Sequence, residues 1–426
     1  MRFVIAPDSY KGSLSSREVG AVMAAAIRRE IPQAQIDVFP MADGGEGTVE
    51  ALVGACGGRS EEVVVHGPLE PGAAALIGLI EQDGEPVYVI ETANICGLPM
   101  ITADRRDPYA ATSRGLGEAI AHALDRGARR LIVGLGGSAV NDGGIGMLAA
   151  LGVRFADRDG RLLEGRGGDL LRVAAVDWSG LDPRLAACAI TAASDVTSPL
   201  TGPAGASRVF GPQKGATPAQ AAELDEAMGA YAALLEQPGG IDMSGARAFE
   251  PSVGGDREIE PSPEDEADEN EQSGVYADNA YADNAGADGL RLSERPGAGA
   301  AGGLGFALLR LGARIESGAE VAARATGLKK RIAGADWVLT GEGRTDAQTL
   351  SGKLPFRVAE WAAAEGVPAI LVSGGLGPDI EPLYEAFAAV FPIVGRPSTL
   401  DECLAEAEDN LARTARNVAR LIKTKT

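Results

Sequence analysis

The chain has 426 residues, which exceeds one ordinary domain, so we expect two domains or three. Its 39 basic and 60 acidic side chains give a formal net charge of −21. That balance argues against a general binder of nucleic acid or of anionic membranes, because both require Lys- and Arg-rich surfaces. The four cysteines form no CxxC pair and there are only two histidines, which excludes a zinc ribbon, a disulfide scaffold and a His-rich metal site.

The N-terminal apolar run stops at Pro7 and Asp8, so it is too short for the core of a signal peptide. No stretch approaches the roughly 20 apolar residues that span a bilayer, and we therefore expect a cytoplasmic protein. Short apolar runs predict strands, in chain order, at residues 2–6, 36–39, 63–65, 76–80, 87–91, 131–135, 189–193, 337–340 and 369–373. Apolar residues at helical spacing predict helices at about 16–27, 115–126, 143–151, 217–236, 318–332, 352–365 and 400–422.

This alternation of strands and helices predicts an α/β fold with a mainly parallel sheet. The strands at 76–80 and 87–91 are separated by a polar turn that contains glycine, which predicts an antiparallel hairpin. Since a hairpin does not belong in an all-parallel sheet, it indicates a second domain with a mixed sheet.

One segment differs in composition from the rest of the chain. Between Glu250 and Glu294 there are fourteen acidic residues and two basic ones, and the sequence YADNA occurs twice in tandem. Such a composition cannot bury a core. We therefore expect residues 250–290 to form a disordered, acidic, low-complexity loop.

Three glycine clusters follow predicted strands and carry a carboxylate beside them: Asp43-Gly44-Gly45, the run 134–144 and the run 340–346. Glycine lets the backbone turn tightly and approach a ligand, and the N–H groups of a following helix can face an anion. In open α/β sheets ligands bind at the carboxyl ends of strands. Tight turns use glycine in any case, but three such clusters favour a site for phosphate and metal.

A fourth cluster, residues 297–305, contains a formal GxGxxG pattern. The dinucleotide-binding interpretation requires a strand directly before it, and none is predicted there. We interpret the cluster as a glycine-rich turn that covers a nucleotide, followed by a helix from about Leu304. The chain has no P-loop, since Gly352-Lys353 is followed by Leu354.

Two further groups of residues suggest chemistry. Asp8-Ser9-Tyr10-Lys11 ends the first strand, where a lysine can pair with phosphate or carboxylate, although a solvated lysine fits the sequence equally well. Asp195 follows the strand at 189–193 and could be a base, a metal ligand or a turn residue.

Together these motifs resemble the type-1 glycerate kinase family. The segments that carry the resemblance occur in the family's order from the first residues to about Gly377: APDSYKGS, PMADGGEGT, GLGGSAVNDGG, SDVTSPLTGP, FGPQKGAT, PGAGAAGGLG and TGEGRTDAQTLSGK. The resemblance implies ATP-dependent phosphorylation of glycerate, usually at the 2-hydroxyl. It also implies two α/β domains with the active site between them. On that basis residues 1–65 and 291–426 form a Rossmann-like domain and residues 66–249 an inserted one.

Phosphoryl transfer depends on positioning and on neutralising charge, with a carboxylate to accept the hydroxyl proton. We expect Asp195 to be that base, and Lys11 and Arg344 to hold the substrate carboxylate or the transferring phosphoryl group. Glu342 and Asp346 are the expected Mg²⁺ ligands, directly or through waters. The residues expected to line ATP are Asp43, Gly44, Gly45, Gly297, Gly299, Gly302 and Gly303. Those expected to receive glycerate or a phosphate are Asp8, Ser9, Gly137, Ser138 and Asn141.

Other functions remain open at this stage. The same scaffold could make 3-phosphoglycerate or act on another small hydroxy acid, and a non-catalytic nucleotide-binding sensor is a remoter alternative. An NAD-dependent dehydrogenase is disfavoured by the misplaced GxGxxG pattern. The expected partners are glycerate and ATP, with neither nucleic acid nor membrane, and the sequence does not fix the oligomeric state.

Overall fold

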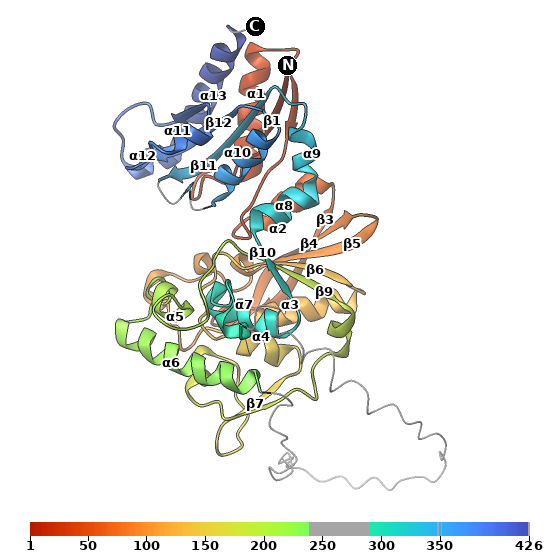
Figure 1. The fold of residues 1–426 in the computed structure, drawn as a ribbon. Helices are drawn as coiled ribbons and strands as arrows, with labels where there is room; N and C mark the ends of the chain where they lie inside the picture. Colours follow the sequence, from red (N-terminus) through yellow and green to blue (C-terminus); the bar gives the residue numbers. More distant parts are fainter. Residues whose placement is uncertain (238–289, 347–348, 351, 425–426) are drawn as a thin grey trace.

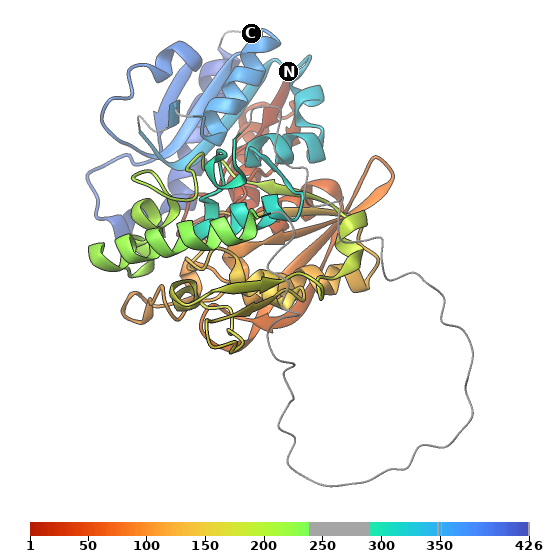
Figure 2. The ribbon, with the colours of Figure 1, turned by 60° about the horizontal axis from the view of Figure 1, so that its bottom comes forward.

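The computed structural model describes residues 1–237, 290–346, 349–350 and 352–424 (Figure 1). The expected acidic loop therefore lies, apart from Leu290, outside the described residues. Among the described residues, the two larger β-sheets and their helices form two units that lie one above the other, and both chain termini lie in the same unit (Figures 1 and 2). The expected two-domain α/β fold class is confirmed.

The first sheet has five parallel strands in the order β13-β12-β11-β1-β2. Their bounds are β1 (Arg2–Ile5), β2 (Gln35–Val38), β11 (Trp337–Thr345), β12 (Ala369–Leu376) and β13 (Ala389–Pro392). Numbered along the chain, these strands lie in the order 2-1-3-4-5. The direction of chain progression therefore reverses between β1 and β11, and such a switch point is where ligands bind in open α/β sheets.

The second sheet has six strands in the order β10-β9-β6-β5-β4-β3. Their bounds are β3 (Arg59–His66), β4 (Pro71–Gln82), β5 (Glu85–Glu91), β6 (Arg130–Gly134), β9 (Ala189–Ala193) and β10 (Arg314–Glu316), and a separate pair is formed by β7 (Arg154–Ala156) and β8 (Ala175–Asp177). Strands β10, β9, β6 and β5 are parallel, whereas β4 is antiparallel to β5 and β3. The predicted hairpin is confirmed. Strands β7, β8, β10 and β13 have only three or four residues each and were not predicted.

The helices pack in three groups. In the first unit lie α1 (Ser16–Glu30), α9 (Leu328–Ile332), α10 (Leu354–Ala364), α11 (Leu383–Ala386), α12 (Leu400–Ala405) and α13 (Ala407–Lys423). In the second lie α3 (Arg114–Asp125), α4 (Ile145–Ala150), α5 (Ala206–Phe210), α6 (Pro218–Leu235) and α7 (Ala300–Arg310). Between the sheets lie α2 (Thr48–Cys56) and α8 (Gly318–Thr326). Within the described residues, no helix combines the length and the apolar character needed to cross a membrane.

Local sequence explains where several helices begin and end. Ser15 and Glu18 form a capping box at the start of α1. The predicted helix at 318–332 is divided at Gly327, whose φ of 70° ends α8 in the left-handed conformation that favours glycine. The predicted helix at 400–422 is likewise divided at Glu406 into α12 and α13.

A single apolar core joins the two sheets. It contains Val4 of β1, Val89 of β5 and Ile132 of β6, and the residues that bridge them come from α2 and α8, among them Val49 and Ala319. Two further cores cover the outer faces, one under α1 and α13 and one inside the second unit. The two units are therefore held together by buried apolar surface.

Strand pairing divides the chain differently from the sequence expectation. Strands β3 and β10 belong to the six-stranded sheet, so residues 59–65 and 314–316 lie with the inserted unit and not with the terminal one. The grouping of residues 1–65 with 291–426 followed the family resemblance, and neither the resemblance nor a strand's own sequence reveals which neighbour each strand pairs with. We propose domain boundaries near residues 57 and 317.

Candidate functional site

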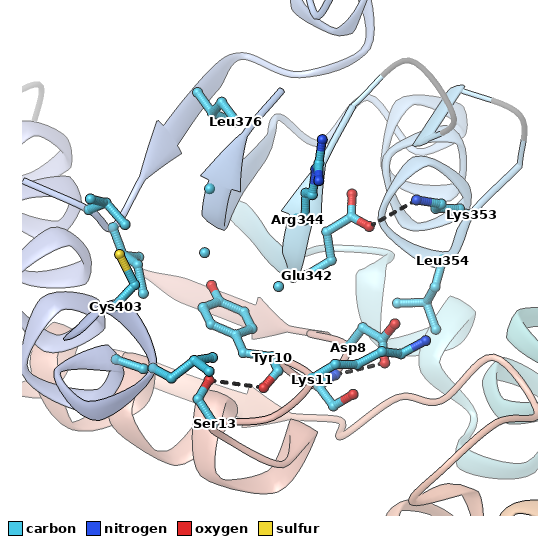
Figure 3. A pocket seen from close by; sticks show the side chains of 18 of the residues that line it. Asp8, Tyr10, Lys11, Ser13, Glu342, Arg344, Lys353, Leu354, Leu376 and Cys403 are labelled. Atoms are coloured by element: carbon cyan, nitrogen blue, oxygen red, sulfur yellow. Dashed lines mark hydrogen bonds and ion pairs between the residues drawn. The ribbon is translucent and has the colours of Figure 1, made fainter. Parts of the chain in front are cut away.

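A pocket of about 560 Å³ opens at the switch point of the first sheet (Figure 3). The residues that follow β1, those at the end of β11 and those at the end of β12 form its walls. Its volume lies within the roughly 300–1,000 Å³ typical of small-molecule sites. Both its place in the topology and its size are those of a ligand site.

Seven of the residues selected from the sequence line this one pocket: Asp8, Ser9, Lys11, Asp43, Asp195, Glu342 and Arg344. Asp195 follows β9 of the second sheet, whereas the other six come from the first unit. The pocket is therefore completed by both units. Lys11 and Arg344 are exposed, so their charges can reach a ligand that enters from solvent.

Glycines bring Asp43 and Asp195 to the same place. A Cβ atom on Gly44 would lie 2.3 Å from the carbonyl oxygen of Ala193, the last residue of β9. A Cβ atom on Gly318 would lie 2.1 Å from the carbonyl of Asp43. Only glycine permits these approaches, so the residues of the Asp43-Gly44-Gly45 turn position the Asp43 carboxylate beside the second sheet.

The carboxylates of the pocket repel one another. Burial and then the nearby charge of Asp43 raise the pKa of Asp8 to about 7, although the backbone N–H of Ser9 donates a hydrogen bond of 2.7 Å to the Asp8 side chain. Partial removal of water and the charge of Asp43 also raise the pKa of Asp195 above its ordinary value. Gly318 N–H donates to Asp195 Oδ1 at 3.0 Å and fixes that side chain.

A lysine that the sequence analysis did not select lies among these acids. Lys353 Nζ is 3.9 Å from Glu342 Oε2 and 3.8 Å from Asp346 Oδ1, and it lines the pocket (Figure 3). Glu342 Oε1 accepts hydrogen bonds from the hydroxyls of Thr345 (2.9 Å) and Thr349 (2.7 Å). Burial raises the pKa of Glu342 above its usual range. In the sequence, Lys353 stands out only through its Gly-Lys pair, which lacks the Ser or Thr of a P-loop and so gives no signal of its own.

Three of the residues expected to receive glycerate or a phosphate do not line the pocket: Gly137, Ser138 and Asn141. Ser138 Oγ and the carbonyl of Val140 accept hydrogen bonds from Lys214 Nζ at 3.0 and 2.6 Å. Lys214 is only 2% exposed, and burial lowers its pKa to about 8. Asn141 Nδ2 donates to Ser207 Oγ at 2.8 Å. This buried polar network supports the glycine loop that follows β6.

The glycine-rich turn at residues 297–305 lies outside the pocket. Gly297, Gly299, Gly302 and Gly303 are all buried in the second unit and do not line the pocket. A Cβ atom on Gly302 would lie 2.0 Å from the carbonyl oxygen of Val140, and one on Gly299 would lie 2.2 Å from that of Pro199. These glycines permit close packing of backbone against backbone, and a role of this turn in covering a nucleotide stays a prediction.

The pocket also has an apolar end. Its residues come from the end of β12, from the segment after β13 and from helices α12 and α13: Leu376, Ile393, Val394, Leu400, Cys403, Leu404 and Ala407. In Figure 3, Cys403 lies on the side opposite Lys353 and Asp8, with the ring of Tyr10 between them. Nothing in the sequence analysis selected these residues, because ordinary helix-packing residues carry no motif.

Comparison with known proteins identifies the family. A family model described as the glycerate kinase family matches residues 3–255 and 263–423. The chain belongs to the glycerate kinase family. The resemblance found in the sequence motifs is thereby confirmed, and the members of this family are phosphotransferases.

Named relatives match over nearly their whole length. Glycerate 2-kinase of Escherichia coli (strain K12) is 40% identical over 98% of this chain and 97% of its own. Glycerate kinase of Bacillus cereus (strain ATCC 10987) is 39% identical over 99% and 98% of the two chains. The crystal structure of a protein described as a candidate glycerate kinase 2 from Salmonella typhimurium LT2 superposes with a TM-score of 0.77 at 40% identity, covering 100% of this chain and 99% of that one.

Proposed function

We propose that this protein transfers the γ-phosphoryl group of ATP to D-glycerate in a Mg²⁺-dependent reaction and releases 2-phosphoglycerate. The observation that supports it most is the pocket at the switch point, where carboxylates and the cations Lys11, Arg344 and Lys353 line one space. The relative from Escherichia coli, which is named glycerate 2-kinase, supports the 2-phospho product.

The chemistry assigned to the pocket follows from its charges. Lys11, Arg344 and Lys353 would neutralise the carboxylate of glycerate and the charge that develops on the transferring phosphoryl group. Asp195 would accept the proton of the attacking hydroxyl. Its raised pKa suits that role, because a base is most effective when its pKa lies near the working pH. The hydrogen bond from Gly318 N–H holds Asp195 Oδ1 in place, and Asp195 lines the pocket that would receive the substrate.

The carboxylates near Lys353 can be compared with what a Mg²⁺ site requires. Among the described residues, no group of three or more His, Cys, Asp or Glu side chains could hold a metal ion. Mg²⁺ bound with ATP needs only one or two carboxylates, because phosphates and waters supply the remaining oxygen ligands. Glu342 and Asp346 fit that need, although Lys353 already lies between them. We therefore propose that Glu342 and Asp346 bind the Mg²⁺ of MgATP through bridging waters. The ion would neutralise phosphate charge there.

One experiment tests both the activity and the position of phosphorylation. The protein is incubated with ATP, Mg²⁺ and D-glycerate, and the product is examined by proton-coupled ³¹P NMR. A phosphate on C2 couples to one proton and gives a doublet, whereas a phosphate on C3 couples to two and gives a triplet. A doublet is expected. A triplet would replace the product with 3-phosphoglycerate, and no new signal would reject glycerate as the substrate.

A parallel incubation separates the alternative substrates. Tartronate and lactate carry the same carboxylate and 2-hydroxyl but differ from glycerate at the third carbon. We expect kcat/KM for both to be at least about tenfold lower than for D-glycerate, the discrimination that a mismatch of 1.4 kcal/mol provides. Equal or better turnover of either acid would assign the site to that acid.

A further inference from the structure

The two ends of the pocket differ in chemistry. Lys11, Arg344, Lys353 and the carboxylates form a charged end, whereas the apolar end defined above contains aliphatic side chains and one thiol. Tyr10, which lies between the ends in Figure 3, cannot donate its hydroxyl proton to a ligand without losing the hydrogen bond of 2.8 Å that it donates to the Val372 carbonyl. One ligand with an apolar head and a polyanionic tail would match both ends.

Glycerate does not account for the apolar end. It has three carbons that carry a carboxylate and two hydroxyls, and each of these groups loses hydrogen bonds with water on entering an aliphatic wall. The cations that could recognise it all lie at the charged end. A pocket of about 560 Å³ also leaves room for a second, larger ligand.

The apolar end exposes a large aliphatic side chain to solvent, as a surface that binds a ligand would. Leu400 is 72% exposed at its rim, in a protein whose other large apolar residues are mostly buried. Leu404, next along the same side, lies over the turn after Tyr10, since its methyl carbons come within 3.7 and 3.9 Å of a Cβ atom placed on Gly12. The apolar wall therefore continues up to the turn that carries Lys11.

We propose that the apolar end, formed chiefly by Leu376, Ile393, Leu400, Cys403 and Leu404, binds the adenine base of ATP. The flat faces of the base bury apolar surface there, and the triphosphate extends toward Lys11, Arg344 and Lys353. This assignment rests on the proposed function only in taking ATP as the phosphoryl donor. It moves the base from the Gly297–Gly303 turn to helices α12 and α13.

Cys403 provides a direct probe. It is half-buried at the apolar end, whereas burial raises the pKa of Cys96 to about 12 and that of Cys188 to about 11, which slows their alkylation. Burial raises the pKa of Cys56 as well, but this half-buried thiol lies outside the pocket, so the change in its labelling rate when ligand is added serves as an internal control. The rate of N-ethylmaleimide labelling at each cysteine is measured by mass spectrometry of peptides, without ligand, with ADP and with inorganic tripolyphosphate.

ADP and tripolyphosphate should affect the labelling rates differently. ADP at ten times its Kd should slow labelling of Cys403 about tenfold, as mass action requires, and should leave Cys56 unchanged. Tripolyphosphate, which can occupy only the charged end, should slow labelling of Cys403 less than about twofold. Equal slowing by both ligands, or none by ADP, would overturn the assignment of the base.

A pair of leucine variants tests the same point without a thiol. Leu400→Ala should weaken ADP binding about fivefold and leave inhibition by tripolyphosphate unchanged, because only the base loses apolar contact. Leu162→Ala removes a leucine that is 53% exposed and lies outside the pocket, and should change neither. Unchanged ADP binding in Leu400→Ala, with ATP-dependent phosphorylation intact, would reject the base site and keep the proposed function. Absence of phosphorylation in the NMR assay would instead reject the function.

Discussion

Replacing Asp8 by Asn should stabilise the ligand-free protein above neutral pH. Burial and the charge of Asp43 raise the pKa of Asp8 from 3.8 to about 7 in the folded state. An acid whose folded pKa lies above its unfolded value loses stability as pH rises from about 4 to about 7, and the loss is complete at pH 8. A shift of about three units corresponds to about 4 kcal/mol, at about 1.4 kcal/mol for each unit.

The expected gain is smaller than that limit. Asp8 is partly exposed, so solvent reduces both the cost of burying its charge and the repulsion from Asp43, and we expect Asp8→Asn to raise the free energy of unfolding by about 2 kcal/mol at pH 8. Asn keeps the oxygen that accepts the hydrogen bond from Ser9 N–H, so the turn should persist. At pH 5 the gain should be less than half as large, because Asp8 is already mostly protonated in the folded wild type.

Urea unfolding at both pH values, in EDTA and without nucleotide, measures these differences. Glu381→Gln removes an exposed carboxylate outside the pocket and should give no gain at either pH. A gain of equal size at pH 5 and pH 8, or a loss at pH 8, would refute the view that burial and the charge of Asp43 raise the pKa of Asp8 in the folded protein.

Three further changes test individual residues. Asp195→Asn should retain the fold and ATP binding but lower kcat by about 10²–10⁴ in the NMR assay, and near-normal turnover would remove Asp195 as the base. Asp346→Ala should raise the Mg²⁺ concentration needed for half-maximal rate, whereas an unchanged requirement would make the 340–346 turn structural. Gly302→Ala should destabilise the protein by about 3 kcal/mol or more, because the new Cβ atom would meet the Val140 carbonyl at 2.0 Å. Gly327 also has a positive φ but has open space around it, so Gly327→Ala should destabilise the protein by only about 1 kcal/mol. If Gly302→Ala instead had normal stability and a raised KM for ATP, the turn at Gly302 would contact the nucleotide.

The part of the site that sequence could predict is the part set by strand ends. Asp8, Asp195 and Glu342 each lie at or just beyond the carboxyl end of an apolar run, and parallel strands bring such ends to one edge. The strand pattern by itself could not show that β9 belongs to a different sheet from β1, and only the family resemblance placed residues 189–193 in an inserted domain. That two sheets contribute to one pocket depends on packing across the middle core, which leaves no local signal.

Glycine was the ambiguous signal. The same residue permits an approach by a ligand or by another segment of backbone, and the sequence does not say which one approaches. At Gly44 the neighbour is the end of β9, and at Gly302 it is the chain at Val140. The apolar residues Leu400 and Leu404 were missed for the opposite reason, since their spacing is that of any packed helix.

Because the two sheets share one apolar core, neither unit can be separated or exchanged without affecting the other. Helices α2 and α8 bury side chains against residues of both sheets, including Val4 on one side and Ile132 on the other. Residues 58–316 taken alone would therefore expose an apolar face, and the same segment from a relative could replace them only if that face still fitted α2 and α8. Recombination between members of this family should then succeed when the exchange points lie in surface loops. It should fail when they lie near residues 57 and 317, where the chain passes from one sheet to the other.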